Sequence, residues 1–200
     1  RSISNSERTK IQESSEAFTK EIIHSNKNYE TKKIFNISSL VNEIKIKFDY
    51  EDGGMLREPK FPMPALWNSL LFYSQLKDDK EIYRHIIRTT DSILSGGIHD
   101  HLGGGISRYS VDKKWIIPHF EKMIYDNGLF LELLSNIYKI SKKNKYKKII
   151  DLIINWLSSE MMNRDGGFYS AVDAESEGKE GKFYSWDKKE ISNLFKNETN

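Results

Sequence analysis

Pairs of adjacent glycines that follow helix-like stretches are the feature that most restricts the fold of this chain. Nine of the twelve glycines lie in clusters, at residues 53–54, 96–97, 103–105 and 166–167. Glycine lets the backbone adopt left-handed conformations or approach another group closely. One interpretation of these pairs is helix C-capping alone. Their recurrence instead predicts helical hairpins whose return loops all reach one end of a toroid of paired helices.

Apolar residues recur at three-to-four-residue spacing through most of the chain, which is typical of helices. A helix is expected to begin at Pro64, because proline suits the first turn, and another at Pro118, extending to about residue 140. The stretch 146–161 is apolar almost all round, so we expect that helix to be buried. The chain is therefore predicted to be all-α. The other expected elements are helices over residues 6–24, 37–48 and 78–94, a short strand at 182–186 and a last helix from about residue 187.

The charge balance argues against nucleic-acid and membrane partners. The chain has 31 Lys and Arg against 29 Asp and Glu, a net charge of +2, which is too balanced to favour either partner. No apolar run approaches the roughly 18 residues of a membrane span, and the polar start is no signal peptide. The absence of cysteine excludes disulfides and thiolate metal sites and fits a cytoplasmic location. The chain starts with Arg1 and stops just after a helix-like stretch, so we interpret it as a piece of a longer protein.

Several motifs resemble one protein family. They are PKFP from residue 59, GGIHDHLGGGISRYSVDKKW from 96, PHFEKMIYDN from 118, GGFYSAVDAESEG from 166 and EGKFYSW from 180. In their order they are similar to spermatogenesis-associated protein 20 and its bacterial YyaL-type relatives, which are thioredoxin-domain-containing proteins. The resemblance implies part of an (α/α)6 toroid, a six-hairpin glycosidase-like fold, with short β-hairpin loops at its mouth. It assigns this partial toroid to residues 49–200, and to residues 1–48 a helical connection that follows a thioredoxin-like domain absent from this chain.

The block 96–126 combines glycine, histidine and charged residues at a density that is typical of an active site. His99, His101 and His119 are candidate metal ligands, because His99 and His101 have the spacing of two ligands and Glu121 lies nearby, but no third ligand has a signature position. We therefore predict no metal and no other cofactor. His101 and His119 are candidates for acid–base catalysis, because imidazole titrates near neutral pH. The alternative is that each is a structural histidine, hydrogen-bonded to a backbone carbonyl.

A helix that starts at Pro118 would place His119, Lys122 and Asp126 on one face. Such a polar stripe suits an inner-ring helix whose end faces a cavity. Glu121 would lie in the first turn, either as a catalytic residue or as a capping carboxylate. Lys122 and Asp126 would either bind substrate or form an i,i+4 ion pair.

Carboxylates supply a second possible mechanism, because glycoside cleavage requires two of them about 5 to 10 Å apart. Asp100, Glu121, Asp173 and Glu175 are the candidates, although the stretch 173–178 is also typical of an ordinary acidic loop. Arg108 is expected either to bind a carboxylate or phosphate of a substrate or to form a salt bridge. Five aromatic residues are expected either to stack on sugar rings or to seal the core: Tyr109, Trp115, Phe168, Tyr169 and Trp186.

The glycine triplet 103–105 lacks the order of a nucleotide-binding loop, and we expect it to turn a hairpin of HDHL and ISRYSVD over the mouth of the toroid. The predicted function is carbohydrate processing on a small-molecule or oligosaccharide ligand, by isomerase- or epimerase-like histidine chemistry or by a glycosidase-like carboxylate pair. The alternative is a non-catalytic ligand-binding or interaction domain coupled to a thioredoxin-like module. The predicted catalytic residues are Asp100, His101, His119, Glu121, Asp173 and Glu175, and the predicted substrate-binding residues are Arg108, Tyr109, Trp115, Lys122, Asp126, Phe168 and Tyr169.

Overall fold

The computed structural model describes residues 5–27 and 36–195, and the chain divides into two compact units, Arg1–Leu40 and Val41–Asn200. In the first unit, helix α1 (Asn5–Lys27) exposes every side chain that the structure describes. This helix confirms the one expected over residues 6–24. Neither α1 nor any other helix in the described residues is long and apolar enough to cross a membrane.

Helix α2 (Ile37–Lys45) begins after Asn36 and confirms the second expected helix, although it ends before residue 48. The Oδ1 atom of Asn36 accepts hydrogen bonds from the backbone N–H groups of Ser38 and Ser39, at 3.0 and 3.3 Å. Asparagine at this position satisfies N–H groups that have no partner inside the helix.

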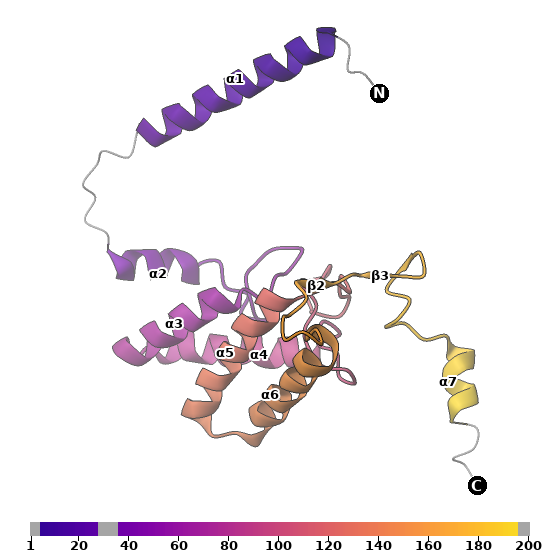
Figure 1. Ribbon diagram of the computed structural model, residues 1–200. Helices are drawn as coiled ribbons and strands as arrows, with labels where there is room; N and C mark the ends of the chain where they lie inside the picture. Colours follow the sequence, from indigo (N-terminus) through magenta and orange to yellow (C-terminus); the bar gives the residue numbers. More distant parts are fainter. Residues whose placement is uncertain (1–4, 28–35, 196–200) are drawn as a thin grey trace. The chain divides into compact units, whose positions relative to one another are not determined.

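The second unit contains two helical hairpins that meet through one helix of each (Figure 1). The hairpins are α3 (Pro64–Lys77) with α4 (Lys80–Ser95), and α5 (Ile124–Ser141) with α6 (Asn144–Trp156). Each hairpin has a very short connection, because the C-cap residues Asp78 and Lys142 adopt the left-handed conformation that ends a helix. Helix α3 packs against both α4 and α5. The paired helices predicted from the periodicity are therefore present.

The hydrophobic core of the second unit draws on every helix of the two hairpins. Trp67 of α3, Ile86 of α4 and Phe130 of α5 are fully buried. The opposite side of α3 exposes Phe72 and Leu76, with 74% and 68% of their surface accessible. A helix that is apolar on both sides is typical of an inner layer between two others.

The first two glycine pairs converge on the buried side chain of Trp115. A Cβ atom at Gly54 would lie 2.7 Å from the Trp115 ring, and one at Gly96 would meet the Trp115 carbonyl oxygen. The indole Nε1 atom donates a hydrogen bond of 2.9 Å to the carbonyl oxygen of Asp52. These two glycine-containing loops therefore reach the same place, whereas Cβ atoms at residues 166–167 would meet nothing within 4 Å.

The helix expected to begin at Pro118 begins instead at Ile124, so that prediction is wrong. The preceding residues are extended, and strand β1 (Lys122–Met123) pairs with the antiparallel strand β2 (Ala171–Val172). Because the backbone groups of this segment bond to neighbouring strands, they are not available to a helix. Proline at 118 here forms a β-bridge with Ser110.

This change of secondary structure also removes the helical face that was expected for His119, Lys122 and Asp126. Only Asp126 lies in a helix, in the first turn of α5. Lys122 forms its ion pair with Asp100 rather than with Asp126. Glu121 lies before the helix, so it is not a residue of the first turn.

Helix α6 is less buried than expected. Tyr146, Ile153 and Trp156 are buried, but Ile154 is exposed. A helix in the outer part of a hairpin has neighbours on one side only, so its other apolar residues remain at the surface. Beyond Trp156 the chain continues as a π-helical turn, Leu157–Met161, a form that is often found at functional sites.

The strand expected at residues 182–186 is absent, because residues 182–184 form a turn and residues 185–186 are irregular, so that prediction is also wrong. The local strand pairing is instead between β3 (Glu175–Ser176) and β4 (Lys179–Glu180). Two residues with positive φ connect these strands, as tight hairpins require. The last expected helix is confirmed as α7 (Lys188–Leu194), which begins after Asp187 with a capping box.

Candidate functional site

The residues before and within the glycine triplet form a tight turn organised by Asp100. Its Oδ1 atom accepts hydrogen bonds from the backbone N–H groups of Leu102 and Gly103, at 3.0 and 2.8 Å. The hairpin expected around this turn is reduced to a single β-bridge between His99 and Ile106. The carboxylate of Asp100 is therefore held by the backbone of its own loop.

The glycine triplet packs against the end of α6. Gly105 has a φ of +80°, and a Cβ atom there would lie 3.0 Å from the Trp156 ring. Only glycine permits both this conformation and this approach. From the other side, the buried Asn127 side chain accepts from the N–H of Ile106 at 2.7 Å and donates to its carbonyl oxygen at 3.0 Å.

Lys122 is the buried cation of the site. Its Nζ atom donates to Oδ2 of Asp100 at 2.7 Å and to the carbonyl oxygen of Gly104 at 2.8 Å. The same ammonium lies 5.2 Å from the centre of the Trp156 ring and 4.8 Å from that of Tyr184, distances typical of cation–π contacts. Burial lowers the pKa of Lys122, and the ion pair with Asp100 opposes this effect.

The pKa of Asp100 also reflects opposing effects. Burial acts to raise it, but the hydrogen bonds from Lys122 and from the N–H groups of Gly103 and Leu102 outweigh burial and hold it below its ordinary value. Asp100 is therefore ionised near neutral pH, and it faces a protonated lysine. Burial raises the pKa of Tyr184 to about 12, so that this ring keeps its proton.

Asp100 and Lys122 line a cavity of about 340 Å³ at the loop end of the hairpins. Loops, strand β1, the end of α6 and the β2–β3 segment all contribute to its wall. The cavity combines carboxylates, one ammonium group and aromatic rings. Its lining residues are Asp100, Gly103, Lys122, Trp156, Glu160, Val172, Asp173, Ala174, Glu175, Ser176, Phe183 and Tyr184. Of the residues predicted from the sequence, Asp100, Lys122, Asp173 and Glu175 are thus brought together.

A second charged cluster contains three further predicted residues, none of which lines the cavity. Arg108 Nη1 lies 3.1 Å from Oε2 of Glu121, so Arg108 forms the salt bridge that was one of its two expected roles. Burial raises the pKa of the neighbouring Asp126 to about 6; Arg108 opposes this shift and Glu121 adds to it. A carboxyl group with such a pKa can donate or accept a proton near neutral pH.

The two histidines proposed as acid–base catalysts also lie outside the cavity lining. The Nε2 atom of His101 is 3.0 Å from the carbonyl oxygen of Gly96, which is the structural role considered as the alternative. The ring of His119 lies 4.6 Å from that of Tyr109, and its Nε2 atom is 3.8 Å from Oε1 of Glu180.

The remaining aromatic residues occupy three different environments. Trp115 is fully buried and belongs to the core, which is the second of its two expected roles. Tyr109 is half-buried between Phe61 and His119. Phe168 and Tyr169 are exposed but do not line the cavity.

The sequence analysis missed the aromatic residues of the cavity and one of its carboxylates: Trp156, Phe183, Tyr184 and Glu160. Trp156 is the last residue of α6 and Glu160 lies four residues later, in the π-helical turn, and both line the cavity. The nearness of these two residues in the sequence could have indicated that they share a site, but the stretch 146–161 was interpreted as a buried helix. Phe183 and Tyr184 belong to the EGKFYSW motif, which was interpreted as a strand.

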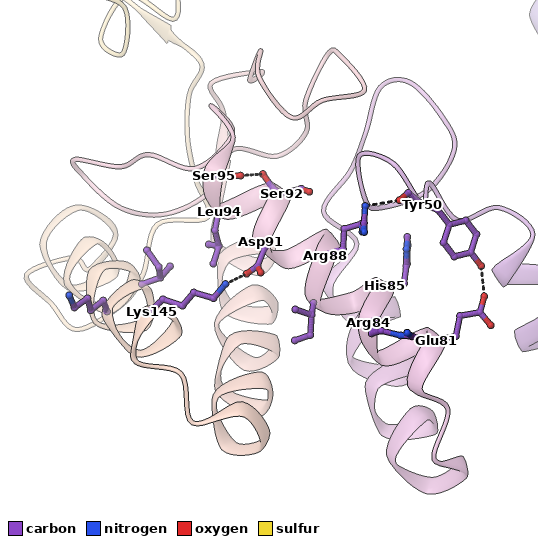
Figure 2. Close-up of a pocket in the computed structure, with 13 residues that line it drawn as sticks. Tyr50, Glu81, Arg84, His85, Arg88, Asp91, Ser92, Leu94, Ser95 and Lys145 are labelled. Carbon is purple, nitrogen blue, oxygen red and sulfur yellow. Dashed lines mark hydrogen bonds and ion pairs between the residues drawn. The ribbon is translucent and has the colours of Figure 1, made fainter.

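A larger groove of about 1110 Å³ lies between α4 and α6 (Figure 2). Several of its charged groups are already engaged: Lys145 Nζ lies 2.6 Å from Oδ1 of Asp91, and Arg88 donates to the Tyr50 carbonyl oxygen at 2.9 Å. The Tyr50 hydroxyl donates to Glu81 at 2.8 Å. None of the predicted site residues lines this groove, so the smaller cavity is the candidate functional site.

Solved structures with a similar fold are carbohydrate-related proteins. A sugar epimerase from a ruminal bacterium matches with a TM-score of 0.58 and 15% identity, over 70% of this chain and 41% of that one. Cellobiose 2-epimerase from Bacillus thermoamylovorans B4167 matches with a TM-score of 0.56 and 13% identity, over 68% and 42% of the two chains. At such identities the likeness shows the fold alone. The two hairpins and their loops are therefore part of an (α/α)6 toroid of the six-hairpin glycosidase-like class.

Sequence comparison identifies relatives of this chain. The chain is 36% identical over 157 residues to spermatogenesis-associated protein 20 of Mus musculus, a match that covers 74% of this chain and 20% of the relative. An uncharacterized protein of Caenorhabditis elegans is 36% identical over 169 residues, or 78% of this chain and 23% of the relative. No family model matches the chain. The chain is thus homologous to part of spermatogenesis-associated protein 20, which confirms the predicted resemblance, and it spans about a fifth of that relative's length.

Proposed function

We propose that this segment supplies one wall of a carbohydrate-processing site, centred on the cavity beside Asp100 and Lys122. The observation that supports this proposal is the convergence of four carboxylates, one ammonium group and aromatic rings on a single cavity. Sugar-processing sites use aromatic rings to contact the sugar and carboxyl groups to exchange protons. Solved structures of the same fold are described as sugar epimerases and as a D-mannose isomerase.

In this proposal the Asp100–Lys122 pair is a fixed electrostatic element rather than a proton donor or acceptor. Asp100 is held in its ionised form by Lys122 and two backbone N–H groups, so it is a weak base. The ammonium of Lys122 has three N–H groups, and two of them donate to Asp100 and Gly104. We assign the third to a substrate oxygen that gains negative charge during the reaction.

Proton transfer is assigned to the carboxyl groups of Glu160, Asp173 and Glu175. A pair of them would serve glycosidase-like cleavage, and one of them acting opposite Lys122 would serve isomerase- or epimerase-like proton abstraction. His101 and His119 lie outside the cavity lining, which favours carboxylate over histidine chemistry.

The second candidate function is non-catalytic ligand binding, coupled to a thioredoxin-like module. One observation favours it: both carboxylate oxygens of Asp100 already accept hydrogen bonds from Lys122, Leu102 and Gly103. A group so fully engaged serves structure or binding more readily than proton transfer.

A panel of mono- and oligosaccharides tests both functions on the full chain. Binding is followed by chemical-shift changes of cavity residues, and turnover by NMR of the sugars. We expect Glu160→Gln and Asp173→Asn to lower turnover by about a hundredfold, and Glu43→Gln, exposed on α2, to leave it unchanged. Binding without turnover in the wild type would support the second function. If no saccharide shifts the cavity resonances, the site assignment is wrong.

A further inference from the structure

The cavity beside Lys122 carries more negative than positive charge. Among the described residues that line it, four are carboxylates and Lys122 is the only cation. Lys122 is already paired with Asp100 at 2.7 Å. Glu160, Asp173 and Glu175 form no ion pair with any residue that the structure describes, and the Asp173 carboxylate accepts a hydrogen bond from the Glu175 N–H. The charge of these three groups is therefore left to act on a ligand.

The aromatic rings that line the cavity also disfavour an anionic ligand. The Trp156 and Tyr184 rings lie 5.2 and 4.8 Å from the Lys122 ammonium, and ring faces attract cations and repel anions. Glu160 stands on the π-helical turn, four residues after Trp156, so that a carboxylate and a ring occupy the same edge of the cavity. An anionic ligand would meet like charge or a ring face on most sides.

A metal ion does not account for this surplus of charge. Among residues 5–27 and 36–195, no group of three or more His, Asp or Glu side chains is arranged to hold a metal. A cavity that combines aromatic rings with a few polar groups is typical of an organic ligand.

We propose that this cavity selects neutral or amino sugars and rejects phosphorylated or uronic sugars, with Glu160 and Glu175 setting the selectivity. The inference rests on the proposed carbohydrate function. Like charges repel, and because Glu160, Asp173 and Glu175 are exposed residues, solvent and salt screen part of this repulsion. We expect glucuronate and a hexose phosphate to bind about tenfold to a hundredfold more weakly than glucose, and glucosamine to bind at least as well as glucose.

The test compares these four sugars by NMR titration of the full chain at low and high salt. The ratio of the affinity for glucose to the affinity for the anionic sugars should decrease at high salt, because screening weakens charge repulsion. Glu160→Gln combined with Glu175→Gln should reduce it at least fivefold, and the control variant Glu43→Gln should preserve it. Anionic sugars that bind as tightly as glucose would overturn the inference while leaving the proposed function intact.

A second measurement does not depend on sugar binding. An amino-substituted nitroxide should broaden the backbone signals of Ala174 and Ser176 more than a carboxy-substituted nitroxide does, relative to the signal of Glu43. Equal broadening by the two nitroxides would overturn the inference, whatever the sugars do. A failure of every sugar to bind, with the nitroxide preference retained, would count against the proposed function alone.

Discussion

The Nζ atom of Lys122 lies 2.7 Å from Oδ2 of Asp100, and this buried ion pair joins the glycine-rich turn to the strand that leads into α5. Only 2% of the Lys122 side chain is accessible. A buried ammonium is tolerated because a carboxylate and a carbonyl oxygen accept its hydrogen bonds. The geometry of the cavity therefore depends on a contact between two segments that are distant in sequence.

Asp100→Asn should destabilise the protein by about 3 kcal/mol, because it leaves the Lys122 ammonium buried without a counter-charge. The double variant with Lys122→Met should cost less than the sum of the single changes. Urea unfolding gives these free energies. The matched control is the exposed pair Lys147–Asp151, where Asp151→Asn should cost less than about 1 kcal/mol. A similarly small cost for Asp100→Asn would contradict the importance of the buried pair.

Gly105→Ala should lower the free energy of unfolding by about 2 kcal/mol or more. The residue has a positive φ, and the new Cβ atom would lie 3.0 Å from the Trp156 ring. The control is Gly128→Ala inside α5, where nothing lies within 4 Å of the new Cβ, so helix propensity should increase stability by about 0.5–1 kcal/mol. Thermal unfolding distinguishes the two. A neutral Gly105→Ala would show that the turn can move away from α6.

Asp126 should make the protein less stable as the pH rises from about 4 to 6. Burial raises its pKa to about 6 from an ordinary value of 3.8, so the folded state holds the proton more tightly than the unfolded state. The stabilisation is complete below pH 3.8 and is lost as the pH passes 6. Asp126→Asn should therefore gain stability relative to wild type across this range, by about 1 kcal/mol after allowance for solvent screening.

Urea unfolding at several pH values measures the effect of Asp126→Asn, and carbon NMR of the carboxyl group gives the pKa directly. Asp165→Asn, in an exposed loop, should show a difference from wild type that does not vary in this way. Titration of Asp126 at or below pH 4 would refute the prediction.

His99 should make the protein less stable as the pH falls, which is the opposite of the pH dependence expected from Asp126. Burial, aided by the charge of His101, lowers its pKa to about 4 from an ordinary value of 6.5. The unfolded state then binds the proton first, so stability is full above pH 6.5 and is lost as the pH falls to about 4, by about 3 kcal/mol. His99→Phe should remove this loss, whatever its cost at neutral pH. Unfolding curves at pH 4 and 7 test this, with His24→Phe on α1 as the control. A constant difference between wild type and His99→Phe would contradict it.

Much of the fold could be predicted because helices depend on local signals. Apolar spacing and Pro64 indicated the helices of the first hairpin, and the last helix was expected from about residue 187, where α7 begins. The segment after Pro118 was wrongly expected to be helical because its extended form depends on β1 pairing with β2. That partner lies far along the chain, and no local pattern indicates it.

The candidate site could be predicted in part for the same reason. Asp100, Lys122, Asp173 and Glu175 stand in glycine-rich or acidic motifs, and they do line one cavity. Trp156, Glu160 and Tyr184 lie in stretches with strong helical or alternating patterns. These stretches were interpreted as a helix and a strand, so the three residues were not considered as site residues. Whether a residue in a regular element faces a cavity is decided by its neighbours in space.

The sequence by itself determined the paired helices, the glycine-containing loops and the group of charged residues near the toroid mouth, because each of these follows from local conformational preference. Only the tertiary structure decided that Lys122 pairs with Asp100 rather than Asp126, and that Trp156 and Tyr184 contact its ammonium. The physical reason is that a buried charge requires partners within a few ångströms. Packing between hairpins and loops determines which groups come that close.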